Sequence, residues 1–323
     1  MALLIGDVGG THTRLVRLPD PVAGPEVRGH ENEQREVRST RPSKAIAEQG
    51  SDLGVEIARF LAPLGPVEAG CLAVAGPVFG GQVHLTNLGW TLDARILSES
   101  LGFPVTLIND FHAQALAMPV LDERHLHRLA PTAAATRPPG DCLVVMGPGT
   151  GLGEAVLVPD GRGDWRVVAG EGGHARFAPR GERAIGLLGF LTERFGTHVS
   201  VERVLSGPGL ASIAEFLGCP GTGDDPAADV TRRALAGESG PVEALTLFVE
   251  ALADEAANMA LRCNAGRVFL TGGIPPKILP FLAPRFRAVF EDKGRYSEWL
   301  RTVPVDVVLH SDPGLIGAAR AAL

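Results

Sequence analysis

Two stretches of the chain share one pattern of hydrophobic and polar positions. In the first, the mainly apolar runs Leu3–Ile5 and Leu15–Leu18 flank a turn rich in glycine and threonine. In the second, between Cys142 and Val158, an apolar run again enters a glycine-threonine turn and another apolar run leaves it. Apolar runs on both sides of such a turn predict a β-hairpin rather than a strand followed by a helix. The repeat indicates that the chain has two similar halves.

Elsewhere, short apolar segments of strand length alternate with segments of helical period. This alternation predicts an α/β fold with parallel strands, whose carboxyl ends commonly meet a ligand. The expected strands are 70–78, 105–108, 267–270 and 305–309, and the expected helices include 53–64, 111–118 and 242–263.

The glycine turns have the chemistry of phosphate-binding loops. Gly9 and Gly10 can adopt positive φ angles and let the backbone approach a ligand, while amides and threonine hydroxyls are donors for phosphate oxygens. Asp7, at the tip of the first strand, can hold a hydrated Mg²⁺ or can cap its own turn. Residues 149–151 repeat the same chemistry. Neither turn fits the P-loop, which needs Gly-Lys-Ser/Thr, or the dinucleotide fingerprint, which needs a following helix.

Two polar groups in the first third of the chain have two interpretations each. Asp110 lies where the strand 105–108 passes into a helix, so that its carboxylate is a helix cap, a general base, or both. Asn87 lies in a polar and aromatic loop, where it either forms a turn or contacts a ligand.

The second half of the chain contains further candidates for binding. The segment Glu171-Gly172-Gly173-His174 has no helical or strand period, which is typical of a binding loop, although a single histidine is more often structural. Glu202 lies in a short helical turn, and by itself this position favours a solvated charge. The turn Thr271-Gly272-Gly273 could press against an adenine or a ribose.

Composition narrows the class of protein. A chain of 323 residues with 45% hydrophobic content can bury the cores of two domains. The net charge of −7 argues against a nucleic-acid surface. The four cysteines lack C-x-x-C spacing, which argues against a zinc site built from them. Since no leader and no membrane-length apolar run is recognisable, the expected location is the cytoplasm.

Taken in order, the motifs of the whole chain resemble those of the bacterial glucokinase family. That family belongs to the fold shared by actin, sugar kinases and heat-shock chaperones, in which two ribonuclease-H-like α/β domains flank a cleft. The resemblance implies a small domain of residues 1–109 plus 311–323 and a large domain of residues 110–310. The matching motifs are Gly6-Asp7-Val8-Gly9-Gly10-Thr11, Leu72 to Pro77, Thr86-Asn87 with Trp90, Asn109-Asp110, Gly147 to Gly153, Glu171 to His174, Glu202 to Gly207 and Thr271-Gly272-Gly273.

The resemblance also implies an activity and a set of site residues. The activity is phosphorylation of D-glucose at the 6-hydroxyl by ATP, with Asp110 as the general base and Asp7 holding Mg²⁺ through water. The implied sugar-binding residues are Asn87, Asn109, Asp110, Glu171, His174 and Glu202. The implied nucleotide-binding residues are Gly6, Asp7, Val8, Gly9, Gly10, Thr11, Gly149, Thr150, Gly151, Gly272 and Gly273.

The sequence departs from the family pattern at one position and leaves two other functions open. His12 stands where the family often has asparagine, which affects only a side-chain contact there. The cysteine-rich zinc motif of related sugar kinases and repressors is absent, so no zinc is expected. The alternatives are a mannose or fructose kinase and a sugar-sensing protein without activity, which would need an added DNA-binding or partner domain. Glucose and ATP are the expected ligands and a homodimer the expected assembly, with no nucleic-acid or membrane partner.

Overall fold

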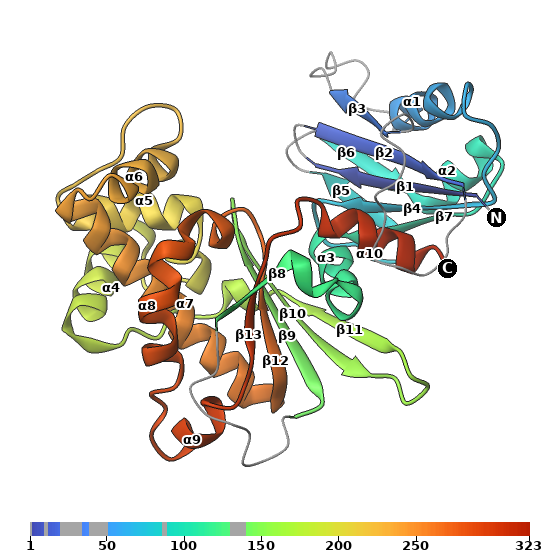
Figure 1. Cartoon of the computed structure of the whole chain (residues 1–323). Coiled ribbons are helices and arrows are strands. Elements are labelled where there is room, and N and C mark those ends of the chain that lie inside the picture. Colours follow the sequence, from blue (N-terminus) through green and yellow to red (C-terminus); the bar gives the residue numbers. More distant parts are fainter. Residues whose placement is uncertain (1, 10–11, 20–33, 39–50, 86–88, 130–139) are drawn as a thin grey trace. The chain divides into compact units, whose positions relative to one another are not determined.

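A computed structural model describes residues 2–9, 12–19, 34–38, 51–85, 89–129 and 140–323 of the chain (Figure 1). The chain divides into two compact units. The first contains Met1–Asp122 together with His310–Leu323, and the second contains Glu123–Leu309. Each unit has its own sheet and its own hydrophobic core, so each is described by itself.

A five-stranded sheet forms the centre of the first unit, with the strand order β3-β2-β1-β4-β7. The predicted first hairpin is confirmed, because β1 pairs antiparallel with β2. Strands β4 and β7 continue the sheet parallel to β1, and β4 is mostly buried, as expected for a strand covered on both faces. The strands are β1 (Leu3–Val8), β2 (His12–Leu18), β3 (Gln34–Arg38), β4 (Ala69–Val74) and β7 (Val105–Asn109), and a separate hairpin contains β5 (Gln82–Leu85) and β6 (Trp90–Asp93).

Helices cover both faces of this sheet. Alternate residues of β1 separate into two cores: Leu4 packs with α1 and α2, whereas Leu3 and Ile5 pack with α3 and α10. Gly317 of α10 fits so closely that a Cβ atom would lie 1.6 Å from the carbonyl oxygen of Ala113 in α3, so glycine is needed at this contact. Figure 1 shows α10 beside α3. The helices of this unit are α1 (Ser51–Leu61), α2 (Ala94–Leu101), α3 (Asp110–Ala117), the 3₁₀ turn η1 (Met118–Val120) and α10 (Pro313–Ala321).

The second unit has a six-stranded mixed sheet in the order β11-β10-β9-β12-β13-β8. The second predicted hairpin is also confirmed, because β9 pairs antiparallel with β10. Strand β12 is parallel to both β9 and β13, and the two edge strands β11 and β8 are antiparallel to their neighbours. The strands are β8 (Leu126–Leu129), β9 (Cys142–Pro148), β10 (Leu152–Pro159), β11 (Trp165–Gly170), β12 (Ala265–Leu270) and β13 (Val305–Val308).

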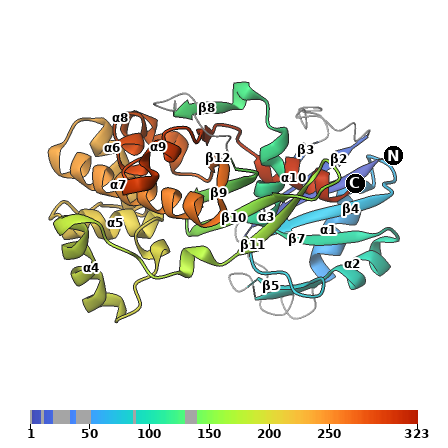
Figure 2. The same cartoon turned by 90° about the horizontal axis from the view of Figure 1, so that it is seen from below.

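One long helix organises the core of the second unit. Helix α7 is mostly apolar and buries Phe248 and Leu252 against the sheet, as the sequence predicted. Figure 2 shows α7 among the other helices of this unit, viewed from below. The helices are α4 (Gly181–Phe195), α5 (Gly207–Phe216), α6 (Pro226–Leu235), α7 (Ser239–Cys263), α8 (Leu279–Phe290) and α9 (Ser297–Leu300), with 3₁₀ turns η2 (Glu123–His125), η3 (Gly172–His174), η4 (Val201–Arg203), η5 (Pro275–Ile278) and η6 (Gly294–Tyr296).

The compact units and the domains expected from the resemblance differ at one helix. Helix α3 packs against α10 and therefore lies in the first unit, whereas the expected domains, 1–109 plus 311–323 and 110–310, assign it to the large domain. Those domain boundaries stay a prediction. None of the described helices combines the length and the apolar character needed to cross a membrane.

Candidate functional site

The carboxyl ends of three parallel strands gather polar groups in the first unit. Asp7 lies near the end of β1, opposite Ala73 of the neighbouring strand β4. Strand β7, on the other side of β4, ends at Asn109 and leads directly into α3 at Asp110. The ends of adjacent parallel strands are the usual place for a ligand in such a sheet. The first unit therefore has a candidate site built on Asp7, Asn109 and Asp110.

Asn109, rather than Asp110, caps helix α3. The Asn109 side-chain oxygen accepts hydrogen bonds from the backbone amides of Phe111, at 2.9 Å, and His112, at 3.0 Å. Its side-chain nitrogen donates to the carbonyl oxygen of Gly76 at 3.0 Å and so ties the turn after β4 to α3. Asp110 is the first helical residue, and its carboxylate also accepts from the Phe111 amide at 2.7 Å. The interpretation of Asp110 as the helix cap is wrong, because the preceding residue has the extended backbone that a cap requires.

Asp7 carries a partly buried carboxyl group among other charges. Its pKa is raised to about 6, mainly by burial and also by the carboxylates of Asp110 and Asp312, while the guanidinium of Arg14 opposes the shift. Arg14 lies directly across the hairpin from Asp7 and forms an ion pair with Asp312. The charges that act on Asp7 thus include two carboxylates and one guanidinium, so that with Asp7 itself the acidic groups outnumber the basic one.

Such an excess of negative charge suits a divalent cation. Within the described ranges, no group of three or more His, Cys, Asp or Glu side chains could hold a metal ion by itself. Mg²⁺ usually keeps several waters and is bound through one or two carboxylates together with substrate phosphates, so it does not require such a cage. The surroundings of Asp7 therefore fit a hydrated Mg²⁺.

The residues around the first glycine turn differ in burial and in how closely other side chains pack against them. A Cβ atom on Gly6 would lie 2.5 Å from Cδ2 of Leu72, so glycine is needed there for packing within the sheet. The Val8 side chain is buried in the core and Gly9 is partly buried. Their expected nucleotide contacts would thus come from the backbone. Gly10, Thr11 and Asn87 lie outside the described residues.

In the second unit, the turn between β9 and β10 lies against two other glycine turns. Within it, the Gly149 amide donates to the carbonyl oxygen of Gly151 at 2.8 Å. The carbonyl oxygen of Gly149 accepts from the amide of Gly207, also at 2.8 Å. Gly272 has a φ of +82°, and a Cβ atom there would lie 2.7 Å from the carbonyl oxygen of Pro148. The structure therefore brings residues 149–151 and 272–273, which are far apart in sequence, side by side.

Glu202 belongs to the same neighbourhood. Its Oε2 accepts a hydrogen bond from the backbone amide of Leu152 at 2.9 Å, where β10 begins. A Cβ atom on Gly151 would lie 2.5 Å from the same oxygen. Because this carboxylate is partly buried and bonded to the strand, its interpretation as a solvated surface charge is wrong.

The loop 171–174 folds into the 3₁₀ turn η3 beside Glu202. A Cβ atom on Gly173 would lie 2.4 Å from the carbonyl oxygen of Leu152, so only glycine lets the loop lie on β10. The side chains of Glu171 and His174 are 73% and 63% exposed, and their nearest charged atoms are 3.9 Å apart. The chain then pairs with the segment before Glu202, since the Val201 amide donates to the carbonyl oxygen of Ala175 at 2.8 Å. The three expected sugar-binding residues of this unit thus come from adjoining segments.

Three charged residues near these groups were not identified from the sequence. Arg14 could have been found by counting residues across the hairpin, because Leu3 pairs with Leu18 and Asp7 therefore faces Arg14. Asp312 had no local signal, since it meets Arg14 through a contact between distant parts of the chain. Glu154 is a charged residue in an apolar strand, a pattern that indicates burial of an ionisable group.

Comparisons with known proteins place the chain in a family and support its fold. A family model described as glucokinase matches residues 4–323. Glucokinase of Chromobacterium violaceum is 37% identical over 98% of this chain and 88% of its own length. The crystal structure of a glucokinase from an Antarctic psychrotroph has a TM-score of 0.81 and 31% identity, covering 99% of this chain and 98% of the other. That of Balamuthia mandrillaris glucokinase in complex with glucose has a TM-score of 0.77 and 21% identity, covering 99% and 93%.

These matches extend over nearly the whole chain and include both units. They confirm the α/β fold class with two actin-like domains that the motifs implied. The chain belongs to the glucokinase family.

Proposed function

We propose that this chain transfers the γ-phosphoryl group of ATP to the 6-hydroxyl of D-glucose, with Asp110 as the general base. The glucokinase relatives support the reaction, since they match the chain from end to end. The position of Asp110 carries the assignment of the base: its carboxylate stands at the end of β7, near Asp7, while Asn109 caps the helix.

In this mechanism the protein mainly positions the reactants. The Asp110 carboxylate accepts the proton of the 6-hydroxyl as the bond between O6 and the γ-phosphorus forms and the bond from that phosphorus to ADP breaks. Fixing the glucose in one orientation brings O6 in line with the leaving oxygen, which contributes more than covalent chemistry by the protein. Asp110 then returns its proton to water.

The other sugar hydroxyls would be held by polar side chains. We assign this role to Glu171, His174 and Glu202, whose segments adjoin one another, together with Asn109 and with Asn87, which lies outside the described residues. A carboxylate can accept hydrogen bonds from two neighbouring hydroxyls, so that several such groups select one orientation of a neutral sugar.

The nucleotide would be bound largely by backbone groups. In the second unit we assign this role to the adjacent turns 149–151 and 272–273, where a Cβ atom on Gly149 or Gly273 would meet no atom closer than 3.9 Å and a ligand could approach the backbone. In the first unit we assign the phosphate contacts to the turn that follows Gly6, Asp7 and Val8 and contains Gly9, Gly10 and Thr11. Asp7 would hold Mg²⁺ through water, and that ion neutralises phosphate charge when it is bound.

The test is a coupled assay of ATP-dependent glucose phosphorylation with the unaltered chain and with Asp110→Asn. Because general-base assistance contributes roughly 10²- to 10⁴-fold to a rate, we expect kcat to fall by that factor while glucose and nucleotide binding remain. Glu99→Gln, a change of an exposed acid on α2, is the matched control. An Asp110→Asn protein with unchanged kcat would contradict the assignment of the base.

A panel of sugars tests the choice of substrate. We expect kcat/KM to be higher for glucose than for mannose or fructose. A higher value for one of these sugars would make the chain a different hexose kinase while leaving the role of Asp110 intact. The homodimer and the cytoplasmic location stay predictions, and light scattering of the purified chain measures the first.

A further inference from the structure

Glu154 is a buried acidic residue that the proposed mechanism does not use. It lies on β10, two residues beyond the start of the strand, and its neighbours across the sheet are Met146 of β9 and Gly170 of β11. The residue is only 6% exposed. Its Oε1 atom is buried and has no hydrogen-bond partner within the part of the chain that the structure describes. A buried carboxyl group in this state is costly unless it is neutral.

The Glu154 carboxyl group packs directly against the loop 171–174. A Cβ atom on Gly172 would lie 2.0 Å from Glu154 Oε2 and 3.0 Å from its Cδ, so the loop backbone rests on the carboxyl group. Gly172 separates Glu171 from Gly173 and His174, the residues assigned to glucose binding. Any movement of the Glu154 carboxyl group toward a new partner must therefore displace this loop.

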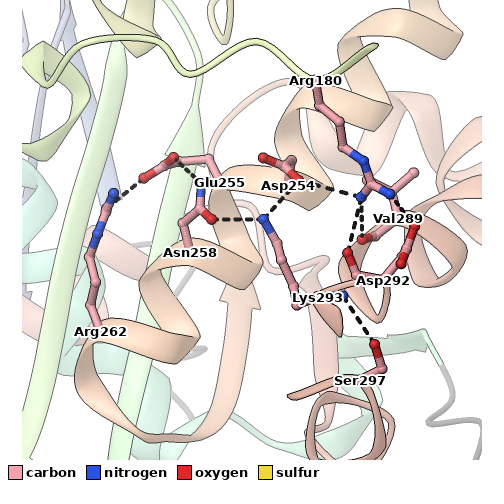
Figure 3. A network of polar contacts seen from close by, with 9 residues as sticks. All are labelled: Arg180, Asp254, Glu255, Asn258, Arg262, Val289, Asp292, Lys293 and Ser297. Atoms are coloured by element: carbon pink, nitrogen blue, oxygen red, sulfur yellow. Dashed lines mark hydrogen bonds and ion pairs between the residues drawn. The ribbon is translucent and has the colours of Figure 1, made fainter. Parts of the chain in front are cut away.

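Helix α7 places the carboxyl group of Glu255 near Glu154. Glu255 is itself buried, and its two oxygens accept hydrogen bonds from Arg262, at 2.8 Å, and from Asn258, at 3.0 Å. Figure 3 shows that this group continues through Lys293, which donates to Asn258 at 2.7 Å and to Asp254 at 2.8 Å. Because Arg262 is already paired with Glu255, it neutralises Glu154 only in part.

The remaining neighbours of Glu154 provide no compensating charge. Met146 and Gly170 do not titrate, and the Glu171 and His174 side chains flanking Gly172 are largely exposed. The pKa of Glu154 is raised to about 7, mainly by burial and also by the carboxylate of Glu255, while the guanidinium of Arg262 opposes the shift. The carboxyl group therefore changes its charge close to neutral pH.

We infer that Glu154 is a positioning residue for the loop 171–174, and that this loop keeps its glucose-binding conformation while the Glu154 carboxyl group carries its proton. The inference rests on the proposed function, because it takes the loop to be part of the glucose site. When the proton leaves, the carboxylate faces Glu255 without a donor and needs water or a new partner. Gly172 leaves no space for either, so the loop shifts and glucose binds less tightly.

The test is the dissociation constant of glucose, measured by calorimetry without nucleotide from pH 6 to pH 8. If only the protonated form binds, a midpoint near pH 7 makes binding roughly tenfold weaker at pH 8 than at pH 6. Glu154→Gln has nearly the same shape but cannot ionise, so its dissociation constant should stay constant over this range. In the unaltered chain, kcat at saturating glucose should change much less than KM. A variant that keeps the full pH dependence would overturn the inference.

A second pair of variants tests the same point through helix α7. Glu255→Gln removes a like charge and should move the midpoint of glucose binding to lower pH, whereas Arg262→Gln removes an opposite charge and should move it to higher pH. Shifts in the same direction, or none, would contradict the role of Glu154 even if Glu154→Gln failed to fold. Absence of glucose binding by the unaltered chain at pH 6 would instead contradict the proposed function.

Discussion

The two hairpins with glycine turns each bury one carboxyl group, and the two groups have different surroundings. Asp7 precedes the first turn, with Arg14 opposite it and Asp110 and Asp312 nearby, and its pKa is raised to about 6. Glu154 follows the second turn, with Glu255 and the already paired Arg262 as its charged neighbours, and its pKa is raised to about 7. Burial is the largest cause in both cases.

The difference shows that two acidic residues in similar hairpins can serve different purposes. Around Asp7, several acids share one arginine at strand ends, an arrangement that a bound cation would stabilise. Around Glu154, the carboxyl group meets a glycine backbone and has no partner for Oε1 among the described residues, an arrangement that a proton stabilises. We therefore expect Asp7 to act as an anion and Glu154 as a neutral group.

The largest effect that separates the two groups concerns the nucleotide. Asp7→Asn keeps the shape of the side chain and removes its charge, so kcat/KM for Mg-ATP should fall by roughly 10²- to 10³-fold through the loss of electrostatic stabilisation. The assay varies Mg²⁺ and ATP at saturating glucose, with Glu99→Gln as the exposed control. Unchanged kcat/KM would remove Asp7 from the phosphate site.

The next effect concerns the pH dependence of stability that Glu154 contributes. A carboxyl group with a raised pKa in the folded state stabilises the fold fully below its unfolded pKa, near 4.5, and loses this contribution as pH rises to about 7. The loss amounts to about 3 kcal/mol. The Glu154→Gln variant has no such pH-dependent contribution. In urea unfolding, its free energy of unfolding relative to that of the unaltered chain should therefore rise between pH 5 and pH 8. A difference independent of pH would contradict a neutral Glu154.

A smaller effect tests the contact between the second hairpin and the loop. Gly173→Ala would place a methyl group against the carbonyl oxygen of Leu152, and the loop must move. We expect the KM for glucose to rise about tenfold, which corresponds to a loss of about 1.4 kcal/mol in binding free energy when the loop is displaced. Gly170→Ala is the matched control, because a Cβ atom there meets no atom within 4 Å. Equal KM values for the two variants would argue against the close packing.

The smallest effect concerns the ion pair between Arg14 and Asp312. Both side chains are partly exposed, at 42% and 30%, so the pair contributes at most about 1 kcal/mol to folding. Asp312→Asn should therefore lower Tm only slightly, by a few degrees at most in a thermal scan. In this variant Arg14 would neutralise the Asp7 carboxylate more fully. A large loss of stability would instead show that the ion pair between Arg14 and Asp312 has a structural role.

Local patterns were sufficient to predict most elements of the fold. Both hairpins and the helix 242–263 depend on residues close together in sequence. Glu202 was misinterpreted because its partner, the Leu152 amide, is fifty positions away. The cap of α3 was placed one residue late because Asn109 and Asp110 are both good caps, and the backbone conformation decides between them.

The candidate site was only partly accessible from the sequence. The motifs identified Asp7, Asp110, Glu171, His174 and Glu202, but the charges that surround Asp7 and Glu154 come from tertiary contacts. Asp312 reaches Arg14 across 298 positions, and Glu255 meets Glu154 only because α7 packs on the sheet. Such contacts leave no periodic signal in one sequence.

The central claim is that Asp110 takes the proton from the 6-hydroxyl of glucose. The most direct measurement is a crystal structure of this chain with glucose and a non-hydrolysable ATP analogue. The account predicts that a carboxylate oxygen of Asp110 lies within about 2.6–3.2 Å of glucose O6, the distance of a hydrogen bond. A complex in which O6 points away from Asp110, or in which another group accepts its proton, would contradict the claim.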